Sequence, residues 1–175
     1  PVMRLGSMTL TSRYDDVREV FGDDRRFGVI YAPKLAVIMG GEPFFLGMGD
    51  TPQYHADVDA MRRVVRADDL PRLGDAVEAQ AAAIVAASGG EVEGVDTLVR
   101  RVTFDFLADY LGVPPPANGD LRVWATRLFE FQFADQGDDP ALRREVDVIA
   151  PALRAHLDAT IAQRHAAPPR DDVLG

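Results

Sequence analysis

Apolar residues recur at helical spacing through most of the chain after Pro52. The longest such pattern begins at Asp139-Pro140 and comprises Leu142, Val146, Ile149, Leu153, Leu157 and Ile161. This spacing places the six side chains on one face of an α-helix. Pro151 falls inside the pattern and is expected to kink the helix. The fold class is therefore mainly α, with helices too unequal and too often interrupted for a simple four-helix bundle.

The same reasoning predicts the other elements. Helices are expected over residues 69–88, from an N-cap at Asp96 to Gly112, and over residues 120–134. The signals before Pro52 predict a strand over 9–11, a helix over 14–21 and a long loop with one helical turn near 35–39. We expect one domain covering residues 1–175, truncated at both ends.

Composition excludes several classes of function. A net charge of −9 and a pI near 4.7 argue against duplex nucleic acid or an anionic membrane surface as partner. The absence of cysteine excludes disulfides and thiolate chemistry, and it fits a soluble, cytoplasmic protein. The most apolar stretch, residues 35–48, is interrupted by glutamate, proline and glycine, so it cannot span a bilayer. Lys34 is the only lysine, which we attribute to genomic composition rather than chemistry.

Residues 44–65 form the most informative local segment. An apolar stretch and a tight turn lead into a helix that Asp50 or Thr51 caps, with a proline at its first position. A buried apolar stripe is expected at Tyr54, Val58, Met61 and Val65. His55 and Arg62, seven positions apart, share one edge of that stripe. Cationic side chains along the edge of an apolar stripe can bind the acid groups of a hydrophobic ligand. The alternative interpretation is that Arg62 simply extends toward solvent from the rim of a core helix.

Aromatic residues cluster where the helix over 120–134 ends. Phe129, Phe131 and Phe133 either pack in the core or line an apolar ligand pocket. The three histidines have no metal-ligand spacing, and no serine lies in a nucleophile-elbow context. Gly47-Met48-Gly49 lacks the third glycine of a dinucleotide fingerprint. Taken alone, these residues support a binding surface better than they support catalysis.

Four segments, in order, resemble the N-terminal half of a cytochrome P-450. They are SRYDDVREVF at 12–21 with Phe27 after it, LGMGDTP at 46–52 leading to MRRVV at 61–65, LADYLGVP at 107–114, and Arg164 with the segment PPRDDVL at 168–174. The resemblance implies a mainly α, cytochrome P-450-like helical fold that is incomplete. It covers the helix B to helix G region, whereas the central helix and the heme-ligand loop are absent.

The resemblance also implies a bacterial, heme-dependent monooxygenase. Such an enzyme inserts one oxygen atom from dioxygen into a hydrophobic organic substrate, with electrons from a ferredoxin or flavoprotein reductase. Arg62 would hold a heme propionate, and His55 and Tyr54 compete for a second such role because the family spaces its histidine and arginine more closely. The loop over residues 27–45 and the last two helices would contact substrate through Met39, Phe44, Phe45, Phe129, Phe131 and Phe133.

The iron ligand is expected outside these residues. Without cysteine the chain cannot form a heme-thiolate centre, so it would be catalytic only as part of a longer protein. The alternative hypothesis is a non-catalytic helical module that binds an apolar ligand or a partner protein.

Overall fold

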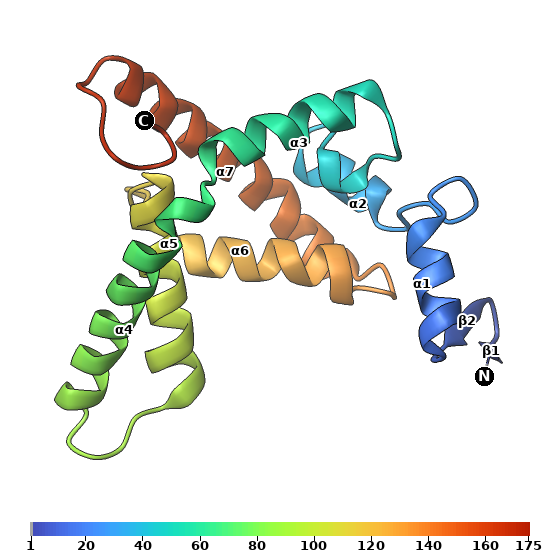
Figure 1. Cartoon of the computed structure of the whole chain (residues 1–175), viewed down its shortest axis with the longest axis horizontal. Coiled ribbons are helices and arrows are strands. Elements are labelled where there is room, and N and C mark those ends of the chain that lie inside the picture. Colours follow the sequence, from blue (N-terminus) through green and yellow to red (C-terminus); the bar gives the residue numbers. More distant parts are fainter. Residues whose placement is uncertain (1) are drawn as a thin grey trace.

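The computed structural model describes residues 2–175, which form helices at many angles beside one small sheet (Figure 1). The sheet is an antiparallel hairpin of β1 (Val2–Leu5) and β2 (Met8–Thr11), followed by α1 (Tyr14–Gly22). The predicted strand and first helix are therefore confirmed, whereas sequence reasoning missed β1. Figure 1 shows this N-terminal part at the opposite end of the molecule from the C-terminus.

The next part of the chain contains the segment singled out from sequence. It comprises α2 (Ala32–Ile38), η1 (Phe45–Gly47), α3 (Pro52–Val64), η2 (Ala67–Asp69) and α4 (Leu70–Ala87). The helical turn expected near 35–39 is thus part of a slightly longer helix that begins earlier. Its one buried residue, Leu35, packs toward η1, where a Cβ on Gly47 would lie 3.0 Å from the leucine Cδ1.

The C-terminal half contains η3 (Gly94–Arg100), α5 (Arg101–Leu111), α6 (Leu121–Phe129), η4 (Glu130–Ala134) and α7 (Pro140–His165), of which η3 and η4 are π-helical. Gly112 ends α5 in the left-handed conformation, with φ 76°. The expected N-cap at Asp96 is wrong. The longer Glu93 side chain instead accepts hydrogen bonds from the backbone N–H groups of Val95, Asp96 and Thr97.

The main hydrophobic core lies where α6 and η4 cross α7. Its buried members are Leu128, Phe131, Leu142, Val146, Ile149 and Ala150, and Val37 and Ile38 of α2 pack against them. The predicted stripe of α7 is therefore buried in its first half, whereas Ile161 is 40% exposed. Proline occupies position 151 inside α7. Figure 1 shows α4 and α5 projecting side by side, away from this core.

Within residues 2–175, no helix combines the length and apolar character that crossing a membrane would need.

Candidate functional site

The N-terminus of α3 is fixed by its own capping residues. Thr51 is the N-cap, and its hydroxyl accepts a hydrogen bond from the Tyr54 backbone N–H at 3.2 Å. Pro52 occupies the first turn, where its missing N–H removes no helical hydrogen bond. Asp50, the other candidate cap, instead pairs with His55, with 2.5 Å between Oδ1 and Nε2. The turn before α3 therefore holds the histidine side chain through a carboxylate.

The apolar stripe of α3 is not buried, contrary to the sequence prediction. Tyr54 and Val58 are half-buried, whereas Met61 and Val65 are 42% and 44% exposed. The reason is that α3 makes its main contacts in the described chain with η1 alone. The spacing of the stripe is correct, but residues 2–175 do not cover it.

Three proposed cofactor-binding side chains lie along this uncovered helix. Arg62 is 76% exposed. Its guanidinium group lies 3.6 Å from the carboxylate of Asp59, an exposed residue one helical turn earlier. The Tyr54 and His55 rings meet edge to face, with 5.3 Å between centroids. His55 and Arg62 are separated by about 10 Å along the axis and by about 20° around it, so they share one face. The Asp50 and Asp59 carboxylates reduce the positive charge of that face.

The proposed substrate-contacting residues fall into two groups. Met39, at the end of α2, and Phe44 and Phe45, around the start of η1, are half-buried. The two phenylalanine rings pack with centroids 4.7 Å apart. The second group lies at η4, which also contacts α2.

At η4 the three phenylalanines separate into core and surface. Phe131 is 4% exposed and belongs to the hydrophobic core, the first of the two alternatives that the sequence left open. Phe129 and Phe133 are 63% and 44% exposed, with rings 4.7 Å apart. Tyr31, at the N-cap of α2, packs edge to face on Phe133 at 4.9 Å. The structure therefore brings α2 and η4 together through an exposed aromatic face, defined by Tyr31, Phe129 and Phe133.

Lys34 is the residue that sequence reasoning assigned to no function. Its ammonium group pairs with the Asp135 carboxylate at 2.9 Å and lies 5.0 Å from the centroid of the Phe131 ring. Asp135 follows η4 and is separated from Lys34 by 101 positions, so no local spacing could have revealed the pair. The available signal was that Lys34 is the only lysine among nineteen basic residues.

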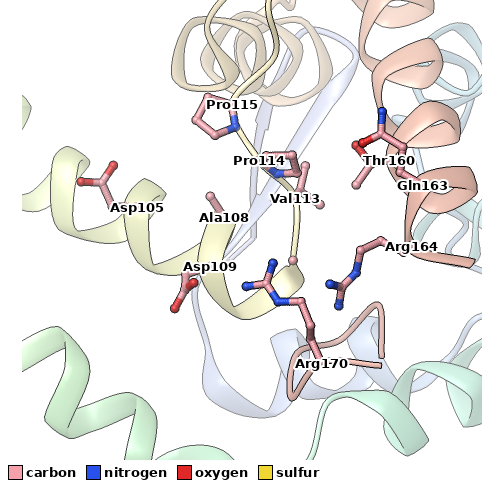
Figure 2. A pocket seen from close by; sticks show the side chains of 11 residues that line it. Asp105, Ala108, Asp109, Val113, Pro114, Pro115, Thr160, Gln163, Arg164 and Arg170 are labelled. Carbon is pink, nitrogen blue, oxygen red and sulfur yellow. The ribbon is translucent and has the colours of Figure 1, made fainter. Parts of the chain in front are cut away.

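A cavity of about 460 Å³ lies elsewhere, between α5, α7 and the segment that follows α7 (Figure 2). Figure 2 shows Arg164 and Arg170 extending into this space from α7 and from that segment. Pro114 and Pro115 line it beyond the end of α5. Arg164 is largely buried, and it pairs with Asp172, whose carboxylate is 4% exposed. The lining of this cavity mixes charged and apolar side chains and includes none of Tyr31, Phe129 and Phe133, so it adds no residue to the aromatic face.

A second polar cluster connects η2 and α5 with the same C-terminal segment. Asp69 is buried and accepts two hydrogen bonds from Arg66, at 2.9 and 3.1 Å, and one from the Tyr110 hydroxyl at 3.3 Å. The hydrogen bonds from Arg66 hold the pKa of Asp69 below its usual value, although burial alone would raise it. Arg66 also pairs with Asp171 at 3.1 Å. These contacts join η2 to α5 and to the C-terminal segment, so we assign the cluster a structural role.

Comparison with known proteins gives two curated relatives. Erythromycin C-12 hydroxylase of Saccharopolyspora erythraea is 29% identical over 171 residues, covering 93% of this chain and 40% of that protein. Cytochrome P450 FAS1 of Rhodococcoides fascians is 25% identical over 185 residues, covering 95% of this chain and 43% of that protein. No protein-family model matches the chain. No solved structure matches it.

The chain thus spans about two-fifths of the length of the curated relatives that it matches. Both relatives are cytochrome P-450s, and the similarity covers nearly all of the chain in each case. The resemblance that the four sequence segments indicated is therefore confirmed: nearly the whole chain is similar to two cytochrome P-450s.

Proposed function

We propose that this chain is the N-terminal part of a heme-dependent monooxygenase that inserts one oxygen atom from dioxygen into a hydrophobic organic substrate. The electrons would come from a ferredoxin or flavoprotein reductase, and the protein would act in the cytoplasm. The observation that carries the proposal is the uncovered apolar stripe of α3 with Arg62 and His55 along its edge. The similarity to two cytochrome P-450s supports the same function.

The residues of α3 suit the edge of a heme. The propionates of heme need cationic or hydrogen-bonding partners, and its flat ring needs apolar cover. Arg62 would hold one propionate, and either His55 or Tyr54 would bind near the other. Met61 and Val65 offer exposed apolar surface beside them. Heme iron, when bound, supplies the activation of dioxygen, whereas these side chains bind and orient the group.

The iron itself requires a ligand from outside these 175 residues, because the sequence contains no cysteine. Within residues 2–175, no three histidine or carboxylate side chains gather closely enough to hold a metal ion. The proposed role of this chain is therefore to bind the heme edge and the substrate, whereas iron ligation would come from another segment of the polypeptide.

A hydrophobic substrate would contact the aromatic face and η1. Phe129 and Phe133 present exposed rings beside Tyr31, and Phe44 and Phe45 offer a second aromatic pair. Met39 would contribute its thioether at the end of α2. Phe131 would act indirectly, because its ring is buried, with the Lys34 ammonium group of α2 5.0 Å from its centroid.

The total exposed surface supports the view that this chain is one part of a larger fold. It exposes 12525 Å², whereas a compact monomer of 19.1 kDa exposes about 8,400 Å². Exposed apolar residues occur on the hairpin, α3, α4 and α5, including Leu10, Met61, Leu70 and Leu107. Apolar surface of this extent normally faces another part of the protein or a partner.

The test uses the full-length polypeptide that contains this chain. We expect a heme-thiolate Soret band in the presence of carbon monoxide, and weaker heme retention after Arg62→Ala, by about 10- to 150-fold for a charge-assisted contact worth about 1.5–3 kcal/mol. Arg63→Ala is the matched control, because Arg63 lies about 100° around the helix from Arg62. Equal heme retention in both variants would remove Arg62 from the site. Failure of the whole protein to take up heme would instead favour the non-catalytic binding module.

A further inference from the structure

The cavity of about 460 Å³ between α5, α7 and the segment after α7, which we call the α5–α7 cavity, has walls that are tied to one another. The segment is joined to α5 because the Val173 backbone N–H donates to the Tyr110 carbonyl at 2.9 Å. The same segment is joined to α7 through the ion pair of Arg164 with Asp172. Two of the three possible connections between the walls are thus direct polar contacts.

The third connection joins α7 to the loop after α5. His156 Nε2 lies 2.8 Å from the Pro114 carbonyl oxygen, 42 positions away in the sequence. A carbonyl oxygen can only accept, so the imidazole must carry a proton on Nε2 and donate it here. One turn later on α7, the Thr160 hydroxyl donates to the His156 carbonyl at 2.8 Å, and Thr160 itself lines the cavity. All three walls are therefore connected in pairs, and the cavity is preformed, as ligand sites usually are.

One wall of the α5–α7 cavity is cationic. Arg164 and Arg170 both extend into this space (Figure 2). The carboxylate of Asp172 serves both arginines: it accepts a hydrogen bond from Arg164, and its Oδ2 lies 3.6 Å from Arg170 Nε. Two guanidinium groups thus share a single carboxylate partner within residues 2–175, which leaves an excess of one positive charge at this wall.

The two arginines differ in how freely they can contact a ligand. Arg164 is 11% exposed, and its guanidinium group is held by Asp172. Arg170 is 64% exposed, and its 3.6 Å contact with Asp172 is longer than a hydrogen bond. Arg170 can therefore turn its planar fork of N–H donors toward an acid group without breaking a hydrogen bond to Asp172. Arg170 is the residue suited to bind an anion directly, whereas Arg164 supplies fixed positive charge nearby.

Part of the lining is aliphatic. It consists of small side chains at the end of α5 and in the loop that follows, namely Ala108, Val113, Pro114 and Pro115. Aliphatic surface beside a guanidinium group suits a molecule that has an apolar body and one acid group. The volume of about 460 Å³ lies within the range of about 300–1,000 Å³ that is typical of small-molecule sites.

Two carboxylates on α5 restrict the charge of such a ligand. Asp105 and Asp109, one turn apart and both exposed, also line the cavity. Asp105 accepts a hydrogen bond from Gln80 at 3.0 Å and lies 3.8 Å from Arg101, so its charge is partly balanced by these neighbours. Both carboxylates would repel a second acid group on a ligand. A monoanion therefore fits the cavity better than a dianion, and an amine is the competing ligand that these carboxylates would favour.

We propose that the α5–α7 cavity is a binding site for small organic acids, in which Arg170 pairs with the carboxylate and the aliphatic lining covers a compact apolar body. The proposal goes beyond the proposed function, because this second site requires no heme and its lining includes none of Arg62, His55 and Tyr54. Its test can therefore fail while the heme hypothesis stands, and the reverse.

The test measures binding of 4-fluorobenzoate to the full polypeptide by fluorine NMR. The probes 4-fluorobenzyl alcohol and 4-fluorobenzylamine have a similar size but are neutral and cationic. We expect saturable binding of 4-fluorobenzoate, and binding of the alcohol that is weaker by about tenfold, because the alcohol offers no charge to Arg170. The absence of benzoate binding, or tighter binding of the amine than of the benzoate, would overturn the proposal.

Substitution of Arg170 tests the proposed partner of the carboxylate. Arg170→Gln should weaken the binding of 4-fluorobenzoate by about tenfold or more, because it removes a charge-assisted pair. Arg170→Lys should weaken it less, because lysine keeps the charge but lacks the planar fork. Arg18→Gln is the control: it removes the same charge from an exposed position on α1, which lies at the other end of the molecule (Figure 1). Equal affinity in the Arg170→Gln and Arg18→Gln variants would overturn the role of Arg170.

The position of the bound probe separates this site from the aromatic face, which is the proposed contact surface for substrate. Nuclear Overhauser effects between the protons of 4-fluorobenzoate and the methyl groups of Val113 are expected, because Val113 lines the α5–α7 cavity. Phe129 and Phe133 do not line it, so their ring protons should show no such effects. Effects on those two rings without any on Val113 would place the acid at the aromatic face and overturn the proposal of a second site.

Discussion

Arg164 on α7 and Asp172 in the C-terminal segment form an ion pair whose side chains are only 11% and 4% exposed. Gly112 packs directly against it, since a Cβ there would lie 2.7 Å from the Asp172 Cγ. The Val173 backbone N–H donates to the Tyr110 carbonyl at 2.9 Å. These contacts fix the segment after α7 against the end of α5.

Removal of the buried Asp172 carboxylate is expected to lower the stability of the protein strongly. Asp172→Asn leaves the Arg164 charge buried without compensation, and breaking such a pair typically destabilises a protein by about 3–5 kcal/mol. Asp171→Asn is a matched control, because the neighbouring carboxylate is 72% exposed and pairs at the surface. Urea unfolding of the two variants in the full polypeptide gives the comparison. If the Asp172 variant lost no more stability than the Asp171 variant, the pair would not have the structural role assigned to it.

Gly112 is expected to tolerate no side chain, for two separate reasons. Its φ of 76° is strained for any L-residue, and the Asp172 carboxylate occupies the place of a Cβ. Gly112→Ala should therefore destabilise by about 2–3 kcal/mol, of which about 1–2 comes from the left-handed backbone. Gly89 has φ 71° with no atom within 4 Å of its Cβ position, so Gly89→Ala measures the backbone term alone. If thermal unfolding showed the same loss of stability in Gly112→Ala and Gly89→Ala, the Asp172 carboxylate would have to move away from the new side chain at no energetic cost.

The sequence predicted elements best where local chemistry determines them. The N-cap at Thr51, the end of α5 at Gly112 and the helix that opens at Asp139-Pro140 depend on residues close together in the chain. Periodicity likewise placed Val146 on the buried face of α7. Such signals need no knowledge of distant contacts.

Features that depend on distant contacts could not be predicted. Periodicity identified the stripe of α3 but could not reveal that residues 2–175 leave it uncovered. It could not separate Phe131 from Phe129, because the crossing of η4 over α7 decides which ring is buried. The pairing of Lys34 with Asp135 and the position of Arg164 in the lining of the α5–α7 cavity likewise depend on how distant segments fold together. The spacing of residues in the sequence does not indicate either of them.

The buried Asp69 should make stability depend on acidic pH. Its pKa is lowered mainly by Arg66 hydrogen bonds, so its contribution is present above the ordinary aspartate pKa of about 3.9. That contribution is lost as the pH falls below this value, through the folded-state pKa. Asp69→Asn should therefore be less stable than the wild type at about pH 7, and the difference should narrow toward about pH 3. Asp68→Asn, at the exposed neighbouring position, is the control. A difference from the wild type that does not change with pH would show that charge on Asp69 has no part in it.

Truncation of Phe131 should destabilise the protein far more than truncation of Phe129. Phe131 is 4% exposed and packs in the core beneath Lys34, so Phe131→Ala should destabilise the protein by about 3–5 kcal/mol. Phe129 is 63% exposed, and Phe129→Ala should change stability by less than about 0.5 kcal/mol.

If the aromatic face binds substrate, Phe129→Ala should instead weaken the binding of hydrophobic ligands to the heme-loaded, full-length protein. Urea unfolding measures the stability change, and ligand-induced shifts of the Soret band measure binding. Phe21→Ala is the control, because Phe21 on α1 is 87% exposed and lies outside the aromatic face. Equal ligand affinity in the Phe129 and Phe21 variants would exclude Phe129 from the binding surface, because exposure alone would then account for both.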